Sequence, residues 1–346
     1  MNMLTEERFL RLTDGRRIAR TSRRVLAAFG LAISIVFGPG AAHAALDAAL
    51  IRNAVVYIEA DVPSDAFTAD VLGTEREGAG VVIGEDGLIL TIGYVMLEAS
   101  RVIVTDSEGR QFPADPLAYD FETGFGLVRA LPPFAAKPVT LGNSDGIALD
   151  DPLLALAAGE PMTTTLVARR TYAGYWEYLL EDALFTAPPH SNFGGAALFD
   201  REGDLVGIGS LNLPDHIGDG SGDPANMFVP INALKPILDD LITTGRRSGP
   251  PRPWLGFYPR ELRQLLYISR VAPGSPADEG GLEKGDQIVS IDSVPVSSLE
   301  TLYATLWDLG ISGVIVPLEI VRKGRPVTLK IKSSDRYRFL KLRQTY

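Results

Sequence analysis

Short apolar segments recur along the chain from Ala45 onward, and turn residues separate them. Segments of this length, bounded by Gly, Asp and Pro, are typical of β-strands in sandwiches and barrels. They fall into two sets, the first at 54–60, 78–83, 88–92 and 101–105 and the second at 139–141, 152–156, 163–168 and 175–180. Two such sets in succession predict two β-barrels side by side, over residues 45–245.

A helical repeat appears only after these strands. Between Pro230 and Gly245, apolar residues at 234, 237, 238 and 241 share one helical face, which predicts a helix over 231–244. Residues 246–253 then combine Pro, Gly, Ser and Arg without apolar periodicity, which indicates a linker between domains.

Residues 254–333 have the pattern of a small α+β domain. The turn Gly285-Asp286 precedes an apolar strand at 288–291, and leucines at 299, 302, 306 and 309 predict a helix over 298–309. The final stretch, 334–346, is short and basic, and we interpret it as a solvated end.

The first 44 residues have the pattern of an export signal. Five arginines between residues 16 and 24 lead directly into the apolar run 25–38, and Ala42-His43-Ala44 provides a small-x-small cleavage site. The run of fourteen apolar residues is shorter than the roughly 20 that a membrane-spanning helix needs. We therefore expect an exported, periplasmic protein without a stable membrane span after cleavage; Thr21-Ser22-Arg23-Arg24 also resembles a twin-arginine signal, and the alternative is an uncleaved anchor.

Removing residues 1–44 makes the chain more acidic. They carry seven arginines and three acidic residues, so the remaining 26 basic and 40 acidic residues give a net charge of −14. Nucleic-acid binding needs a concentrated basic face, so this balance argues against such a partner. The chain has no cysteine, which excludes disulfides.

The stretch from Asn192 to Ile208 carries the most informative motif. It reads as a glycine-rich turn, an apolar strand, a polar turn and a second strand, and it resembles the nucleophile loop of trypsin-like serine proteases. Aligned backward from Leu198-Phe199-Asp200, the position of the nucleophilic serine holds Gly194.

The last domain resembles a bacterial PDZ domain through Pro273-Gly-Ser-Pro-Ala-Asp and Gly281-Leu-Glu-Lys-Gly-Asp. Two barrels, a helix, a linker and a PDZ domain resemble the HtrA (Deg) family of periplasmic serine proteases. The resemblance places Tyr94 at the position of the catalytic histidine and Gly124 at that of the aspartate. A mainly β fold, a trypsin-like double barrel followed by an α+β PDZ domain, is therefore expected.

The three substitutions remove the groups that hydrolysis needs: a nucleophile, a base and an orienting carboxylate. We therefore expect no catalytic residues, no cofactor and no metal, and at most an oxyanion-hole shape in the amides around Gly194. The alternative is an active endopeptidase with an unorthodox site, for which His190 and Ser191 are the candidates, although adjacent residues seldom form a dyad. A third possibility is a structural subunit of an envelope complex.

The resemblance implies a peptide site in the PDZ domain. The turn Trp254-Leu255-Gly256-Phe257 would hold the C-terminal carboxylate of a peptide or protein, and the ligand would add as a strand beside Phe257-Tyr258. Its last side chain would lie against Leu302 and Leu306. The alternative is that these leucines only complete the core. The oligomeric state stays open.

One further polar loop, 214–224, contains Asp215, His216, Asp219 and Asp223. These residues could bind a cation, but no spaced ligand pattern is present, and we interpret the loop as an acidic surface segment.

Overall fold

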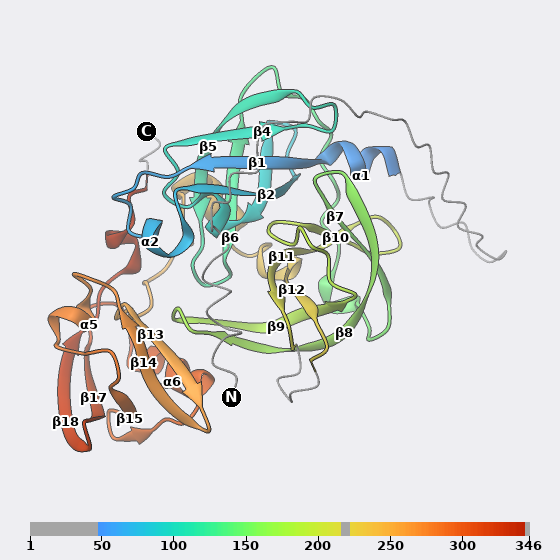
Figure 1. Cartoon of the computed structure of the whole chain (residues 1–346). Helices are drawn as coiled ribbons and strands as arrows, with labels where there is room; N and C mark the ends of the chain where they lie inside the picture. Colours follow the sequence, from blue (N-terminus) through green and yellow to red (C-terminus); the bar gives the residue numbers. More distant parts are fainter. Residues whose placement is uncertain (1–47, 216–221, 343–346) are drawn as a thin grey trace, which may run out of the picture.

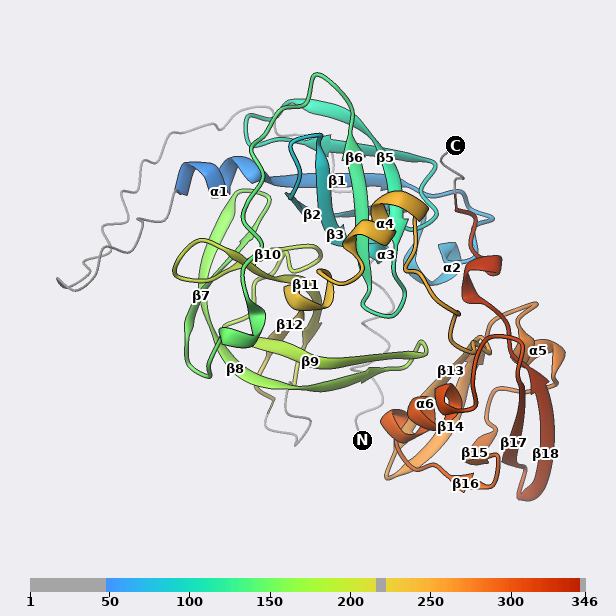
Figure 2. The ribbon, with the colours of Figure 1, turned by 180° about the vertical axis from the view of Figure 1, so that it is seen from behind.

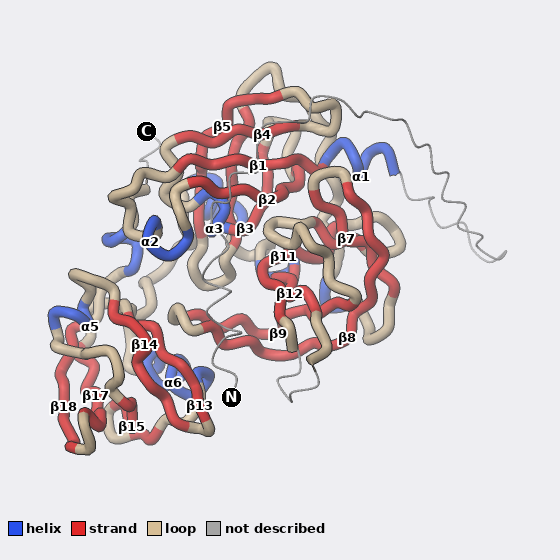
Figure 3. The backbone as a smooth tube through the Cα atoms, viewed as in Figure 1, coloured by secondary structure: helices blue, strands red, loops and turns tan. Residues whose placement is uncertain are grey.

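The computed structural model describes residues 48–215 and 222–342. Figure 1 shows two barrels above and beside a smaller third lobe. Strand content dominates throughout, as the tube in Figure 3 makes clear. The predicted fold class, a double β-barrel followed by an α+β domain, is confirmed.

The first barrel closes in the order β1-β2-β3-β6-β5-β4 with antiparallel pairs throughout. Its strands are β1 (Val55–Asp61), β2 (Glu75–Val82), β3 (Leu88–Ile92), β4 (Arg101–Thr105), β5 (Gln111–Tyr119) and β6 (Phe125–Ala130). Three short helices accompany it: α1 (Ala48–Ala54), α2 (Ala69–Leu72) and α3 (Gly93–Met96). All five residues of β3 are buried, so this strand runs through the core and carries α3 at its end.

The second barrel closes in the order β10-β11-β12-β9-β8-β7. Its elements are η1 (Ser144–Gly146), β7 (Pro152–Ala157), β8 (Glu160–Gly174), β9 (Tyr178–Ala187), β10 (Ala197–Phe199), β11 (Leu205–Leu213) and β12 (Ala225–Pro230). Strand β8 is 15 residues long, and with β9 it forms a hairpin that leaves the barrel and extends toward the third lobe in both Figure 1 and Figure 2.

The third lobe is one sheet in the order β13-β14-β15-β17-β18, with β16 paired to β15. Its elements are β13 (Phe257–Leu262), β14 (Leu265–Val271), α5 (Pro276–Glu279), β15 (Gln287–Ile291), β16 (Val294–Pro295), α6 (Leu299–Asp308), β17 (Ile315–Arg322) and β18 (Arg325–Lys332). Ser298 caps α6 by accepting a hydrogen bond from the backbone N–H of Thr301. Strand β13 lies at one edge of the sheet, and α6 packs near it.

The predicted helix over 231–244 is wrong in its first half. The structure has a 3-10 turn, η2 (Ile231–Ala233), and then a shorter helix, α4 (Leu238–Thr244). Pro236 explains the interruption, because proline lacks the N–H that an α-helix interior requires and disfavours helical geometry in the residue before it.

Two predicted strands of the second set also differ from the structure. Residues 139–141 make only an isolated bridge through Leu141 to Leu205. Residues 175–177 of the predicted strand 175–180 form the turn of the β8–β9 hairpin, and β9 begins at Tyr178. Trp176 of this turn is partly buried and packs against the core of the barrels, which explains why a turn carries apolar residues here.

The interpretation of the C-terminal stretch as a solvated end is wrong for its described part. Residues Arg336–Phe339 form the turn η3, and Leu340 is buried with Tyr119 and Phe121 of the first barrel. The Tyr337 hydroxyl donates to the backbone oxygen of Tyr119 at 2.7 Å. The tail therefore returns from the third lobe to the first barrel, as Figure 1 shows in dark red.

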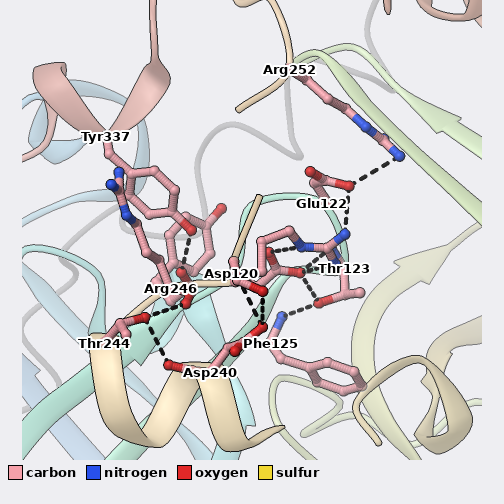
Figure 4. A network of polar contacts seen from close by, with 12 residues as sticks. Asp120, Glu122, Thr123, Phe125, Asp240, Thr244, Arg246, Arg252 and Tyr337 are labelled. Carbon is pink, nitrogen blue, oxygen red and sulfur yellow. Dashed lines mark hydrogen bonds and ion pairs between the residues drawn. The ribbon is translucent and has the colours of Figure 1, made fainter. Parts of the chain in front are cut away.

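The predicted linker 246–253 is attached to the first barrel by ion pairs of Arg247 and Arg252. Arg247 makes a bidentate contact with Asp120, with both N–O distances 2.8 Å, and a second ion pair with Glu122 at 2.7 Å. Arg252 reaches the same Glu122 at 3.0 Å (Figure 4). Since the Asp120 side chain is fully buried, the linker arginines supply the charge that this carboxylate requires.

Candidate functional site

The glycine-rich loop before β10 lies between the two barrels. The backbone oxygen of Gly194 accepts a hydrogen bond from the N–H of Ala79 in β2 at 2.8 Å. Gly195 has a φ of +75°, and a Cβ there would lie 2.0 Å from the backbone oxygen of Ala79. Only glycine fits at residue 195, so the sequence of this loop is dictated by the close approach of the first barrel.

Tyr94 lies on α3, directly opposite Gly194. Its hydroxyl donates to the backbone oxygen of Ser210 in β11 at 2.8 Å. A Cβ added at Gly194 would lie 2.9 Å from that hydroxyl oxygen, so the tyrosine fills the space in which a side chain at 194 would stand. Burial raises the pKa of Tyr94 above its ordinary value of 10.0, which makes the phenol a poor proton acceptor near neutrality.

Gly124 is connected to the same region through the backbone. Its oxygen accepts from the N–H of Gly93, the residue before Tyr94, at 2.7 Å. Its φ of +87° is a left-handed conformation that glycine adopts without steric cost. The hydroxyl of Tyr178 donates to the neighbouring backbone oxygen of Thr123 at 2.8 Å. The structure thus brings Tyr94 close to Gly194, and it joins Gly124 to the residue that precedes Tyr94.

The alternative pair, His190 and Ser191, is not arranged as a dyad. His190 is 3% exposed, its Nδ1 accepts from the Asn192 N–H at 3.0 Å, and its Nε2 lies 2.9 Å from the backbone oxygen of Glu160. The first bond leaves the proton on Nε2, which donates to that oxygen. Both ring nitrogens are therefore engaged, whereas Ser191 is exposed.

Several amides of this loop bond within the protein. The N–H of Asn192 donates to His190, that of Gly195 to the Gly209 oxygen at 2.8 Å, and that of Ala196 to the Phe193 oxygen at 3.1 Å. These three donors are not directed into a site where a substrate oxygen could bind.

The polar loop 214–224 is only partly described. His216 and Asp219 lie outside the described residues. Across 48–215 and 222–342, no group of three metal-ligating side chains comes together.

The carboxylate turn, which we define as the three residues Leu255, Gly256 and Phe257, already holds a carboxylate. Their backbone N–H groups donate to the side chain of Glu177, at 3.0 Å to Oε2 from Leu255 and at 2.6 and 3.2 Å to Oε1 from Gly256 and Phe257. Gly256 has a φ of +84°, and a Cβ there would lie 2.4 Å from Cβ of Ser275. Sequence reasoning missed Glu177, although it is the single acidic residue in the aromatic turn of 175–178.

The other residues predicted for the peptide site have different surroundings. Trp254 exchanges two backbone hydrogen bonds with Ser334, and its ring lies 4.7 Å from that of Phe339. Trp254 therefore connects the beginning of the third lobe with the segment that follows its last strand. Tyr258 follows the carboxylate turn on the edge strand β13.

Leu302 and Leu306 are fully buried on α6. They belong to the core of the third lobe, against which Ala173 and Leu179 of the β8–β9 hairpin also pack. Strands β8 and β9 of this hairpin both contact α6, the helix that carries these leucines.

Comparisons with known proteins agree with this architecture. The pattern of a trypsin-like peptidase domain matches residues 78–208, and that of a PDZ domain matches 267–306. The chain is homologous to the HtrA serine proteases. It is 27% identical to the putative serine protease HhoA of Synechocystis sp. over 75% of this chain and 71% of that protein. It is 26% identical to the periplasmic serine endoprotease DegP of Salmonella typhimurium over 74% of this chain, which spans 56% of DegP.

A solved structure of a variant of the HtrA-type protease AlgW with tripeptide has the same fold. The TM-score is 0.50 at 22% identity, and the match covers 83% of this chain and 95% of that one. Within 48–215 and 222–342, no helix is both long and apolar enough to cross a membrane.

Proposed function

We propose that this HtrA homologue acts by binding peptides or protein C-termini through its PDZ domain and not by hydrolysing them. The observation that carries this proposal is the convergence of the Leu255, Gly256 and Phe257 amides on one carboxylate. Three N–H groups directed at two carboxylate oxygens are the donor set by which a backbone turn captures a chain terminus.

The residues at the three catalytic positions support the absence of hydrolysis. Neither Gly124 nor Gly194 carries a side chain, and the Tyr94 hydroxyl donates to a backbone oxygen. Without a nucleophile or a base, the cleft retains no route to an acyl-enzyme. The two barrels would then serve as the scaffold that positions the PDZ domain.

The proposed site of action is the periplasm. The support is the export-type pattern of residues 1–44 together with the homology to the periplasmic endoprotease DegP. Expression with an epitope tag and osmotic-shock fractionation would test this, and recovery in the cytoplasmic fraction would refute it.

Peptide capture is tested by titrating residues 45–346 with a fluorescein-labelled pool of heptapeptides that have randomised last three positions. The proposal expects saturable fluorescence polarisation with free C-termini, and its loss when the same pool is amidated, because the amide has no charge for the turn to bind. Equal binding of the two pools, or no binding up to millimolar peptide, would overturn it.

A further inference from the structure

The β8–β9 hairpin tip, which we define as residues 173–179, occupies the place of a bound peptide terminus. The Glu177 carboxylate is 4% exposed and uses both oxygens to accept the three N–H groups of the carboxylate turn. No part of that donor set remains for a second carboxylate. The contact also joins residues separated by 78 to 80 positions, so local chain folding does not bring it about.

Contacts from α6 hold the same tip. The Tyr303 hydroxyl accepts from the Glu177 N–H at 3.3 Å and donates to the backbone oxygen of Gly174 at 2.7 Å. The tip therefore occupies the carboxylate position, and its Ala173 and Leu179 pack against the PDZ core beside α6. An extended peptide and the tip therefore cannot occupy the site together.

The tip is held in a conformation that favours release once its contacts are lost. Glu177 has a φ of 54°, in the left-handed region that side chains other than those of Gly, Asn and Asp seldom adopt. Burial of the Glu177 carboxylate also carries a desolvation cost, which its hydrogen bonds and the nearby charge of Arg336 offset. The left-handed backbone and the desolvated carboxylate both oppose binding of the tip to the PDZ domain, and the contacts described above offset them.

We infer that Glu177 is a built-in ligand of the carboxylate turn, and that a peptide with a free C-terminus binds by displacing the hairpin tip. The inference rests on the proposed function, because it assigns the regulation of that same site. Its consequence is that peptide binding detaches the PDZ domain from the second barrel at this contact. The peptide class that competes best has an apolar last residue, since the tip packs its apolar residues Ala173 and Leu179 against the PDZ core that includes Leu302 and Leu306.

A tethered ligand competes strongly even when its intrinsic affinity is weak. Intramolecular partners reach effective concentrations of about millimolar for short flexible connections, and a folded hairpin is better oriented than a flexible chain. We therefore expect removal of the Glu177 carboxylate to lower the peptide Kd by at least about tenfold.

The experiment compares wild type, Glu177→Ala and Glu177→Gln, with Glu181→Ala as the matched control. Glu181 lies on β9 of the same hairpin, is exposed, and loses the same charge on substitution. Each protein, as residues 45–346, is titrated with the labelled heptapeptide pool restricted to Val, Leu or Phe at the last position, free or amidated.

We expect the Kd for the free pool to fall at least about tenfold in Glu177→Ala and less in Glu177→Gln, whose amide retains one accepting oxygen. Glu181→Ala should bind as wild type does. If all four proteins bind the free pool equally, the inference is overturned while the proposed function stands. If none binds, the proposed function falls, and displacement by peptide falls with it.

Amide hydrogen exchange provides a readout that does not depend on peptide affinity. The amides of residues 255–257 should exchange slowly in wild type and in Glu181→Ala and at least about tenfold faster in Glu177→Ala. Added peptide with a free C-terminus should slow them again in Glu177→Ala. Equal exchange in wild type and Glu177→Ala would show that Glu177 does not hold the turn, and would overturn the inference even if peptides bind.

Discussion

Two regions of the molecule that could bind a substrate or ligand are occupied by its own side chains. Tyr94 occupies the space beside Gly194 between the barrels, and Glu177 occupies the carboxylate turn of the PDZ domain. Between the barrels, the residues at the positions expected to carry catalysis are Tyr94, Gly124 and Gly194. In the turn, all three donors are present and bound to Glu177. Under the proposed function, the first site lacks its catalytic groups, whereas the second keeps its donors and is occupied by a contact that a ligand can displace.

The largest expected effect concerns the cleft. We expect turnover of unfolded casein about 10⁶-fold below that of an intact serine protease, and no labelling by a fluorophosphonate probe. Gly194→Ser should also remain unlabelled, because a Cβ there lies 2.9 Å from the Tyr94 hydroxyl and both ring nitrogens of His190 are already engaged. Labelling of wild type that disappears in Ser191→Ala would contradict the proposed absence of hydrolysis.

The second-largest effect concerns the buried ion pair between Asp120 and Arg247, which anchors the linker to the first barrel. Asp120 accepts from Arg247 and also from the N–H and hydroxyl of Thr123 at 3.0 and 2.7 Å. Removing one partner of a buried ion pair typically costs about 3 kcal/mol or more, so Asp120→Ala should lower the free energy of unfolding by about that amount. Urea denaturation measures it.

The control for Asp120→Ala is Glu108→Ala, since Glu108 pairs with Arg110 at an exposed position where its side chain is 68% accessible. We expect this control to change the free energy of unfolding by less than about 0.5 kcal/mol. A similar small change in Asp120→Ala would show that the linker anchorage is not a source of stability.

The third effect is a dependence of tip docking on pH. Burial is the main cause that raises the pKa of Glu177 from 4.5 to about 7, and it outweighs the opposing hydrogen bonds and the charge of Arg336. Burial also raises the pKa of the nearby Tyr258 and Tyr303 hydroxyls, so these stay neutral in this range.

A carboxyl with the higher pKa in the docked state binds a proton more readily when docked. Docking is therefore strongest below about pH 4.5 and weakens as the pH rises through about 7. The peptide's own pH dependence is removed by comparison with Glu177→Ala. Relative to that variant, wild type should bind the free pool up to about 70-fold better at pH 8 than at pH 5. A constant ratio between the two proteins across this range would contradict the prediction.

The smallest effect comes from the second contact of the tip. Tyr303→Phe removes the hydroxyl that bonds Gly174 and Glu177 but keeps the ring stacked on Trp307. Losing these bonds should weaken docking by about 1 kcal/mol and tighten peptide binding by roughly fivefold. The same titration measures it, and Tyr267→Phe, on a strand away from the hairpin, should leave the Kd unchanged.

The sequence predicted the parts of this molecule that follow local rules. Short apolar segments bounded by turn residues predicted four of the six strands of the first barrel, and Ser298 marks the start of α6. Pro236 could have predicted the broken helix, because its effect on the backbone is local as well.

The contacts between domains could not be predicted in this way. Glu177 reads as one acidic residue among aromatic ones, and only the packing of distant segments brings it to the carboxylate turn. In the tail, the basic residues suggested solvation, whereas Tyr337, Phe339 and Leu340 between them determine its position. Side chains that stabilise an interface between domains carry no periodicity that a single sequence would display.

The paired hydrogen bonds between Trp254 and Ser334, at 3.1 and 3.0 Å, mean that the chain enters and leaves the PDZ domain at one corner. Arg247 fixes the incoming segment to the first barrel, and Tyr337 fixes the outgoing one. The carboxylate turn follows Trp254 directly, so the hairpin tip contacts the PDZ domain beside this corner. Release of the tip would leave the anchors at Arg247 and Tyr337 in place.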